Sequence, residues 1–207
     1  MNFSILLEKT LQLGDSPWNF IVISFVTTLF LIFSVILFGF LTYLFEKIEI
    51  AILKKIFGLK FAIFFSNYFT FPGIFVHELS HALFCVLTGA KLKEICIFEN
   101  HSERLGHISY SNCGPFLLRA IQDSLIAAAP TIIGSILLYF LFFTLFTKEL
   151  NYWQILVILY SILSLLNHSS MSSVDRSAYL KNFWILLIPV FTIIFVYLRF
   201  FQNIQVY

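Results

Sequence analysis

The stretch FPGIFVHELSHALFCVL, residues 71–87, places an H-E-x-x-H motif inside an apolar run. On an α-helix, residues four apart lie about 40° apart around the axis, so His77 and His81 point the same way and can hold one metal ion. Glu78 lies beside them, close enough to reach a water molecule on that ion. Ionisable groups at membrane depth are costly, so their presence in this run indicates a function that needs them.

The composition is that of a membrane protein. Of the 207 residues, 59% are hydrophobic and only 12% are charged, whereas soluble domains carry about 25% charged residues. We therefore expect a small multi-pass protein of the cell membrane, built as a single membrane-embedded domain over residues 1–207. The net charge is only +2 and the basic residues are scattered, which argues against nucleic acid as a partner.

Apolar runs and helix-breaking residues predict an all-α integral membrane protein with about five transmembrane helices and a short β-hairpin after the H-E-x-x-H helix. The expected spans are residues 18–43, 72–88, 119–146, 152–166 and 183–201. Within this plan, residues 1–60 hold an interfacial segment (1–13), the first span and a charged connector (46–60). Residues 61–182 form the core, and residues 183–207 the C-terminal helix. The hairpin strands are expected at 94–98 and 107–110, joined by a turn at 100–106.

Small and helix-breaking residues refine two of these helices. Pro72 interrupts the apolar stretch 61–89, so the motif helix is expected to begin there and to end at Gly89 as its cap. The run 127–130, Ala-Ala-Ala-Pro, is followed by Gly134 and gives the next helix a small-residue face. Such a face lets helix backbones approach closely in a membrane.

A catalytic zinc site usually uses three protein ligands and keeps one position for water, so a third ligand must come from elsewhere in the chain. The candidates are Asp175, His107, His101, Asp123 and His168. We favour Asp175, which closes the segment NHSSMSSVD, residues 167–175, at the end of an apolar helix. Two histidines and one carboxylate suit Zn²⁺ as the cofactor.

Over roughly residues 70–180, these motifs resemble the site-2 protease class of intramembrane zinc metalloproteases. Members of that family carry H-E-x-x-H on one transmembrane helix and N-x-x-P-x-P-x-L-D-G two helices later. Asn167 and Asp175 keep the N-x7-D spacing, but serines replace the prolines, Val174 replaces Leu and Arg176 replaces Gly. The chain therefore resembles a divergent, minimal member.

The resemblance implies an intramembrane zinc endopeptidase that cleaves membrane-protein or peptide substrates within the lipid bilayer. His77, His81 and Asp175 would hold Zn²⁺, Glu78 would act as general base, and Asn167 would bind the substrate or the developing oxyanion. One alternative is a non-catalytic relative that binds membrane helices, which the altered second motif favours. Another is a metal-ion transporter, which the scarcity of ionisable groups in the first, third and fifth helices disfavours. The sequence leaves the oligomeric state open.

Overall fold

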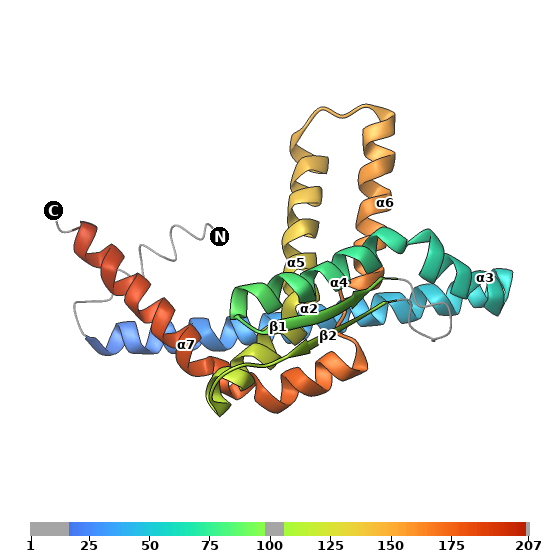
Figure 1. The fold of residues 1–207 in the computed structure, drawn as a ribbon. Helices are drawn as coiled ribbons and strands as arrows, with labels where there is room; N and C mark the ends of the chain where they lie inside the picture. The colour runs from blue at the N-terminus through green and yellow to red at the C-terminus, as the bar shows by residue number, and fades with distance from the viewer. Residues whose placement is uncertain (1–16, 98–105, 206–207) are drawn as a thin grey trace. The chain divides into compact units, whose positions relative to one another are not determined.

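The structure is a computed structural model that describes residues 17–97 and 106–205. The described elements, in chain order, are α2 (Pro17–Phe57), α3 (Leu59–Phe64), the π-helix η1 (Phe65–Phe69), α4 (Phe71–Thr88), β1 (Lys91–Cys96), β2 (His107–Ser111), α5 (Phe116–Thr147), α6 (Tyr152–His168) and α7 (Ser173–Gln205) (Figure 1). The expected interfacial segment 1–13, the candidate ligand His101 and most of the expected turn at 100–106 lie outside the described residues.

Four helices of the described chain are long and apolar enough to cross a membrane: Trp18–Phe57, Phe71–Thr88, Phe116–Thr147 and Ser173–Phe200. The helix α6 is also apolar but shorter, at 17 residues. The protein is thus mostly helical, with several candidate spans and one short antiparallel hairpin. Four of the five expected spans have the length and composition for crossing a membrane.

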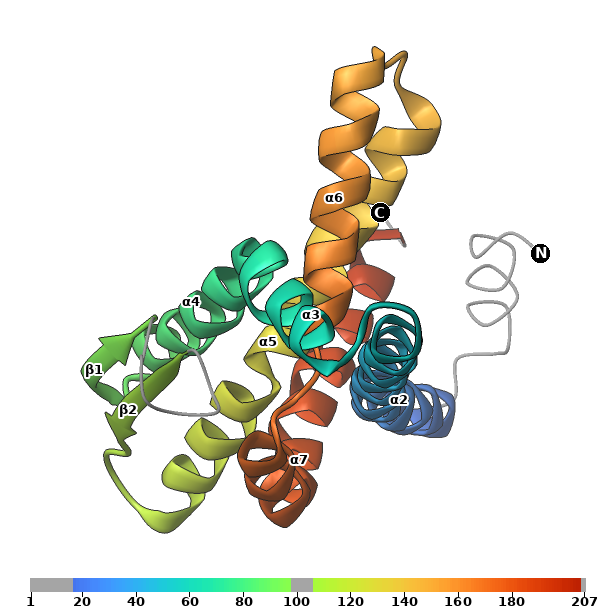
Figure 2. The same cartoon turned by 90° about the vertical axis from the view of Figure 1, so that its right-hand side faces the viewer.

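The chain forms two compact units, one within residues 1–34 and 184–207 and the other from residue 35 to residue 183. The larger unit contains the H-E-x-x-H helix, the hairpin and all the candidate ligands that the structure describes. In this unit α4 packs against both α5 and α6, across the C-terminal end of α6 (Figures 1 and 2).

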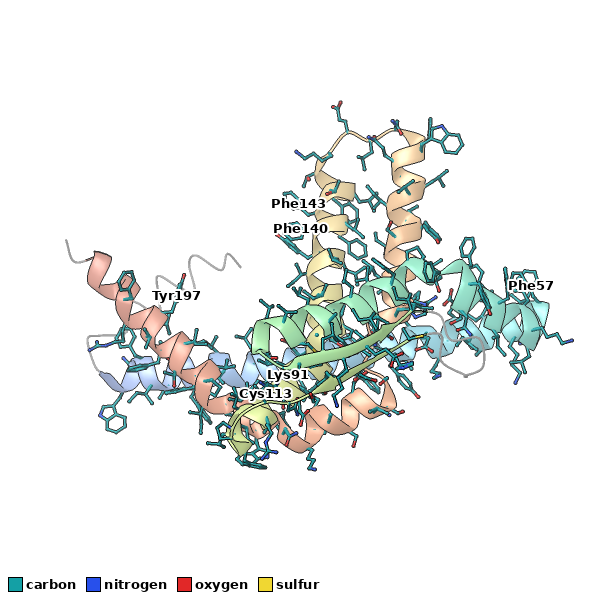
Figure 3. All side chains as sticks on the ribbon, viewed as in Figure 1. Phe57, Lys91, Cys113, Phe140, Phe143 and Tyr197 are labelled. Carbon is teal, nitrogen blue, oxygen red and sulfur yellow. The ribbon has the colours of Figure 1, made fainter. Side chains whose placement is uncertain are left out.

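Small residues permit the close packing of α4, α5 and α6. The residues 127–130 of α5 are almost fully buried, as the sequence predicted for its small-residue face. At Gly73, on α4, a Cβ atom would overlap the backbone oxygen of Ser164 on α6. The two helices therefore touch at the level of their backbones, which only glycine permits here. Farther along α5, Phe140 and Phe143 project outward (Figure 3) and are 57% and 50% exposed, as suits a surface that faces lipid.

The two ends of α4 confirm the sequence prediction. Pro72 lies in its first turn, and Gly89 follows its last residue in the left-handed conformation, with φ 74°. The Gly89 N–H donates to the Val86 carbonyl, and the following Ala90 N–H donates to the Cys85 carbonyl. These bonds satisfy carbonyls that the end of the helix would otherwise leave without partners.

Two expected boundaries are wrong. The first helix does not end near Tyr43 but continues through the charged residues of the expected connector to Phe57. Glu and Lys favour helix, and the next helix-breaking residue is Gly58, which has φ 87°. The polar segment expected up to Lys181 is helical from Ser173, so the fifth apolar helix begins about ten residues early.

The hairpin forms as expected, with Ile95 opposite Ile108. Its first strand begins at Lys91, earlier than the predicted residue 94, because a register irregularity between Leu92 and Glu94 lets the pairing continue toward α4. The hairpin packs along α4, so its strands lie beside the helix that carries the H-E-x-x-H motif.

Candidate metal centre

The two histidines of α4 are oriented by backbone carbonyls from neighbouring helices. His77 Nδ1 lies 2.6 Å from the carbonyl oxygen of His168, at the end of α6. His81 Nδ1 lies 2.7 Å from the carbonyl oxygen of Ile126, on α5. A carbonyl oxygen can only accept, so each Nδ1 carries the proton and each Nε2 presents a lone pair. This is the usual arrangement of metal-binding histidines, whose second nitrogen donates to a carbonyl or carboxylate.

The structure places Asp175, on α7, beside the Nε2 atoms of His77 and His81. Its Oδ2 lies 3.5 Å from His81 Nε2 and 3.9 Å from His77 Nε2, and the two Nε2 atoms are 3.2 Å apart. With both Nδ1 atoms protonated, all three facing atoms are hydrogen-bond acceptors. A single proton can join two of them, whereas one metal ion could bind all three at once.

The spacing of these acceptors suits a small metal ion. Ligand atoms that each lie about 2.0–2.1 Å from one tetrahedral Zn²⁺ ion stand roughly 3.3–3.5 Å from one another. Of the observed separations of 3.2, 3.5 and 3.9 Å, the second lies within that range and the other two lie outside it by a few tenths of an ångström or less. His77, His81 and Asp175 could therefore hold a metal ion.

A capping box at the start of α7 positions Asp175. The Ser172 hydroxyl donates to Asp175 Oδ2 over 2.5 Å, and the Ser172 N–H donates to the same oxygen over 3.2 Å. In return, the Asp175 N–H donates to the Ser172 hydroxyl oxygen. Asp175 thus lies in the first turn of α7 and not at the end of the preceding helix, as the sequence had suggested. The positive end of the helix dipole also favours its carboxylate.

Glu78, on α4, lies beside the three candidate ligands and faces the hairpin. Its side chain is buried, and together with the three ligands it lines a cavity of about 350 Å³. The hairpin approaches it closely at Gly106, where a Cβ atom would lie 2.9 Å from Glu78 Cγ and 3.0 Å from Glu78 Oε1. The backbone at Gly106 therefore limits where the Glu78 carboxyl group can lie.

Asn167 also lines this cavity, from the last turn of α6. It is only 2% exposed, and neither atom of its amide has a hydrogen-bond partner among the described residues. The Glu49 carboxyl group lies close enough to the amide to interact with it. A buried amide without partners is costly, so this side chain suits a group that binds a ligand.

The other candidate ligands have different surroundings. His168 Nε2 lies 2.9 Å from the Thr70 hydroxyl, which ties the end of α6 to the start of α4. Asp123 accepts hydrogen bonds from Asn112 over 2.6 Å and from the Tyr110 hydroxyl over 3.4 Å, and so joins the hairpin to α5. His107 lines the cavity without belonging to the ligand cluster.

Tyr110 contributes a neutral hydroxyl to the cavity wall. Burial, together with the nearby negative charge of Asp123, raises the pKa of the Tyr110 phenol. The phenol therefore keeps its proton at neutral pH and donates a hydrogen bond to Asp123. Together with Asn167, it gives the cavity wall two neutral polar side chains beside the charged cluster.

Sequence reasoning missed the supporting residues of the site. The Ser172-x-x-Asp175 pattern before an apolar run is a capping-box signal that could have placed the start of α7. The carbonyls of His168 and Ile126 and the close approach of Gly106 arise from tertiary packing, and local spacing gives no signal for them.

Comparisons with protein-family models, with curated proteins and with solved structures give no match to this chain. Function is therefore inferred from the side chains of the site and their geometry.

Proposed function

We propose that this protein is an intramembrane zinc metallopeptidase, a divergent and minimal counterpart of the site-2 proteases, with α6 as a fifth short span. The observation that carries the proposal is the convergence of three acceptors, His77 Nε2, His81 Nε2 and Asp175 Oδ2, on one point. Glu78 lines the same cavity, and the helices that bear these groups are apolar enough to lie in a membrane. Hydrolysis is the chemistry that needs this set of groups in an apolar place.

The three acceptors are the ligands of Zn²⁺ in this proposal, because two imidazoles and one carboxylate match its preferences. When bound, the ion polarises the scissile carbonyl group and lowers the pKa of water toward 7. The hydrogen bonds from Nδ1 to the His168 and Ile126 carbonyls fix both imidazole rings, and the Ser172 cap fixes the carboxylate. The chain thus prepares the ligands before the metal arrives.

Glu78 handles the protons of the reaction. Its carboxylate takes a proton from the attacking water and passes it to the leaving amine, which is the role of a general base that later acts as an acid. The backbone at Gly106 restrains the carboxyl group on the hairpin side. The Asn167 amide, which has no partner within the described residues, binds the substrate backbone or the oxyanion.

The test compares wild-type protein with Glu78→Gln in proteoliposomes that contain labelled single-span peptides. Purified wild type should carry close to one Zn²⁺ per chain. Glu78→Gln should keep the metal and lose about 10²–10⁴-fold in cleavage rate. Glu149→Gln serves as the matched control, since that carboxyl group is exposed between α5 and α6. Wild type that folds without zinc contradicts the proposal, as does full activity in Glu78→Gln.

The same preparation separates the alternatives. Uptake of Zn²⁺ into the proteoliposomes, without cleavage, would identify a metal transporter. Peptide binding that is equal in wild type and Glu78→Gln, without cleavage by either, would identify a non-catalytic membrane-helix-binding protein.

In this proposal the hairpin captures the substrate. A peptide bond within a helix is shielded, so the substrate must unwind, and a free strand edge can pair with the extended segment. Both strands pack along α4, and Ile108 and Tyr110 of β2 line the cavity with the proposed ligands. Ile108→Pro or Tyr110→Pro removes a backbone donor from β2 and should sharply reduce cleavage at unchanged zinc content. Ile108→Ala, which keeps the donor, is the control, and wild-type cleavage by both proline variants would make the hairpin a simple connector.

A further inference from the structure

An aromatic surface lies on the segment that joins α2 to α4, at the bend where the chain leaves α2 (Figure 1). Its rings follow one another at helical spacing in two rows, Phe57, Phe61, Phe65 and Phe69 in the first and Phe64 and Tyr68 in the second. Centres of neighbouring rings lie between 4.6 and 6.1 Å apart. All of these side chains except Phe65 are exposed. The described part of the chain therefore leaves this apolar surface uncovered.

The backbone beneath the aromatic surface is fixed at both ends. The Tyr160 ring of α6 meets the Phe69 ring edge-on at 5.3 Å, and its hydroxyl donates to the Phe69 carbonyl over 2.6 Å. At the other end Gly58 has φ 87°, a conformation that glycine adopts readily and that lets the chain turn between α2 and α3. The Gly58 N–H still donates to the Lys54 carbonyl, over 3.0 Å. The rings are thus presented by ordered backbone.

Three lysines lie within the same segment. Lys54 and Lys55 are in the last turn of α2, Lys60 is in the first turn of α3, and all three are exposed. Within residues 17–97 and 106–205, the lysine that forms an ion pair with a carboxylate is Lys47, whose Nζ lies 3.7 Å from Glu46 Oε1. The other three bring positive charge to the aromatic surface without a counter-ion from the described chain.

This combination of groups fits the surface of a membrane. Aromatic side chains are favoured at the level of the lipid headgroups, where their rings contact the upper parts of the acyl chains. A lysine can lay its methylene stem along an apolar surface and keep its ammonium group at the level of the phosphates. The segment also follows α2, a candidate membrane span, without interruption. An acidic protein could balance the lysines, but a phospholipid brings the anion and the apolar chains in one molecule.

We propose that Lys54, Lys55 and Lys60, together with the aromatic surface, bind the headgroups of anionic phospholipids. None of these residues is a proposed metal ligand or lines the metal cavity, so the inference does not depend on the proposed function. The ammonium groups attract the lipid phosphate, and the rings hold the acyl chains below it. Because the lysines are exposed, salt should weaken the attraction.

The experiment measures which lipid lies beside this segment in the full chain, reconstituted in bilayers. The exposed Trp18, Trp153 and Trp184 are changed to Phe, and Phe57→Trp then places one fluorophore in the aromatic surface. Brominated phosphatidylglycerol or brominated phosphatidylcholine, each mixed with the other lipid unbrominated, quenches this fluorophore when it occupies the surface. Phosphatidylglycerol should be preferred about tenfold or more, since each lysine near an anionic surface is worth roughly fivefold. In 1 M NaCl most of the preference should disappear.

Two sets of variants separate this surface from the net charge of the chain. Changing its three lysines to Gln should abolish the preference, and changing them to Arg should preserve it. The matched control changes Lys91, Lys93 and Lys148 to Gln. These exposed lysines lie on β1 and after α5, so their loss removes the same charge elsewhere and should leave the preference intact.

Equal quenching by the two brominated lipids overturns the proposal, and so does a preference that survives the three Gln substitutions. Loss of the preference in the control set overturns it as well, because the net charge would then be its cause. Circular dichroism shows whether each variant is folded. If the triple Gln variant fails to fold, Lys54→Gln alone takes its place and should reduce the preference several-fold. Release of the lipid by soluble polyglutamate would assign the surface to an acidic protein instead.

Discussion

The helix α4 and the junction between α6 and α7 both contribute to the candidate metal centre, but they position their candidate ligands differently. His77 and His81 are one turn apart on a single helix, so their relation is fixed by local geometry. Asp175 comes from another helix, and a capping box between Ser172 and Asp175 determines its position. The spacing of the two histidines is therefore insensitive to small shifts of neighbouring helices. The position of Asp175, in contrast, depends on the residue at which α7 begins.

The largest effect on zinc binding is expected when either histidine of α4 is replaced. His77→Ala or His81→Ala should reduce zinc content from near one per chain to near zero, a loss greater than the roughly 10–100-fold that outer-shell changes cause. Leu79→Ala, at an exposed position on the same turn, is the control and should keep its zinc. The measurement is metal content of purified protein, and unchanged zinc in either histidine variant would remove α4 from the metal centre.

Substitutions at the junction between α6 and α7 should have a smaller effect. They should lower both helix stability and zinc affinity. Ser172→Ala removes the cap, which costs about 1 kcal/mol of helix stability and should lower zinc affinity about 10–100-fold. Ser172→Thr keeps the hydroxyl and should restore most of the affinity. Competition with a zinc chelator measures both variants. If Ser172→Ala binds zinc as wild type does while Asp175→Asn does not, the junction holds Asp175 without the capping box.

The smallest effect is expected at Gly106, which limits where the carboxyl group of Glu78, the proposed general base, can lie. Gly106→Ala should push the Glu78 carboxyl group aside and slow cleavage by about tenfold, or 1.4 kcal/mol of activation free energy, at unchanged zinc content. Gly39→Ala is the control, because a Cβ atom there makes only ordinary contacts, the nearest 3.5 Å from Thr131 Oγ1. Unchanged cleavage rates with unchanged KM in Gly106→Ala would show that the hairpin does not position Glu78.

The sequence was most informative where structure depends on neighbours along the chain. The H-E-x-x-H spacing, Pro72 and Gly89 predicted α4 with nearly correct ends, because helix periodicity and capping are local properties. The hairpin was also predicted, although its first strand begins earlier than expected. Asp175 was favoured as a ligand, and the structure brings it beside both histidines.

The sequence was least informative where tertiary packing or helix continuity decides. A charged segment after Tyr43 suggests a connector in a membrane protein, yet nothing in it breaks a helix before Gly58. The serines before Val174 suggested a loop, although Ser172 starts a helix by capping it. The carbonyls that orient His77 and His81 belong to residues 45 or more positions away, which no local pattern reveals.

The contact at Gly73 links the candidate metal centre to the mechanics of a surrounding bilayer. Because α4 and α6 meet there backbone to backbone, the gap between them is set by the absence of one methyl group. One turn along α4, the carbonyl that holds His77 belongs to α6 as well. Whatever spreads these helices, whether a thinner bilayer, lower lateral pressure or a harsh detergent, also pulls that carbonyl from the imidazole. The separation of α4 and α6 and the orientation of the His77 imidazole are therefore coupled in this unit.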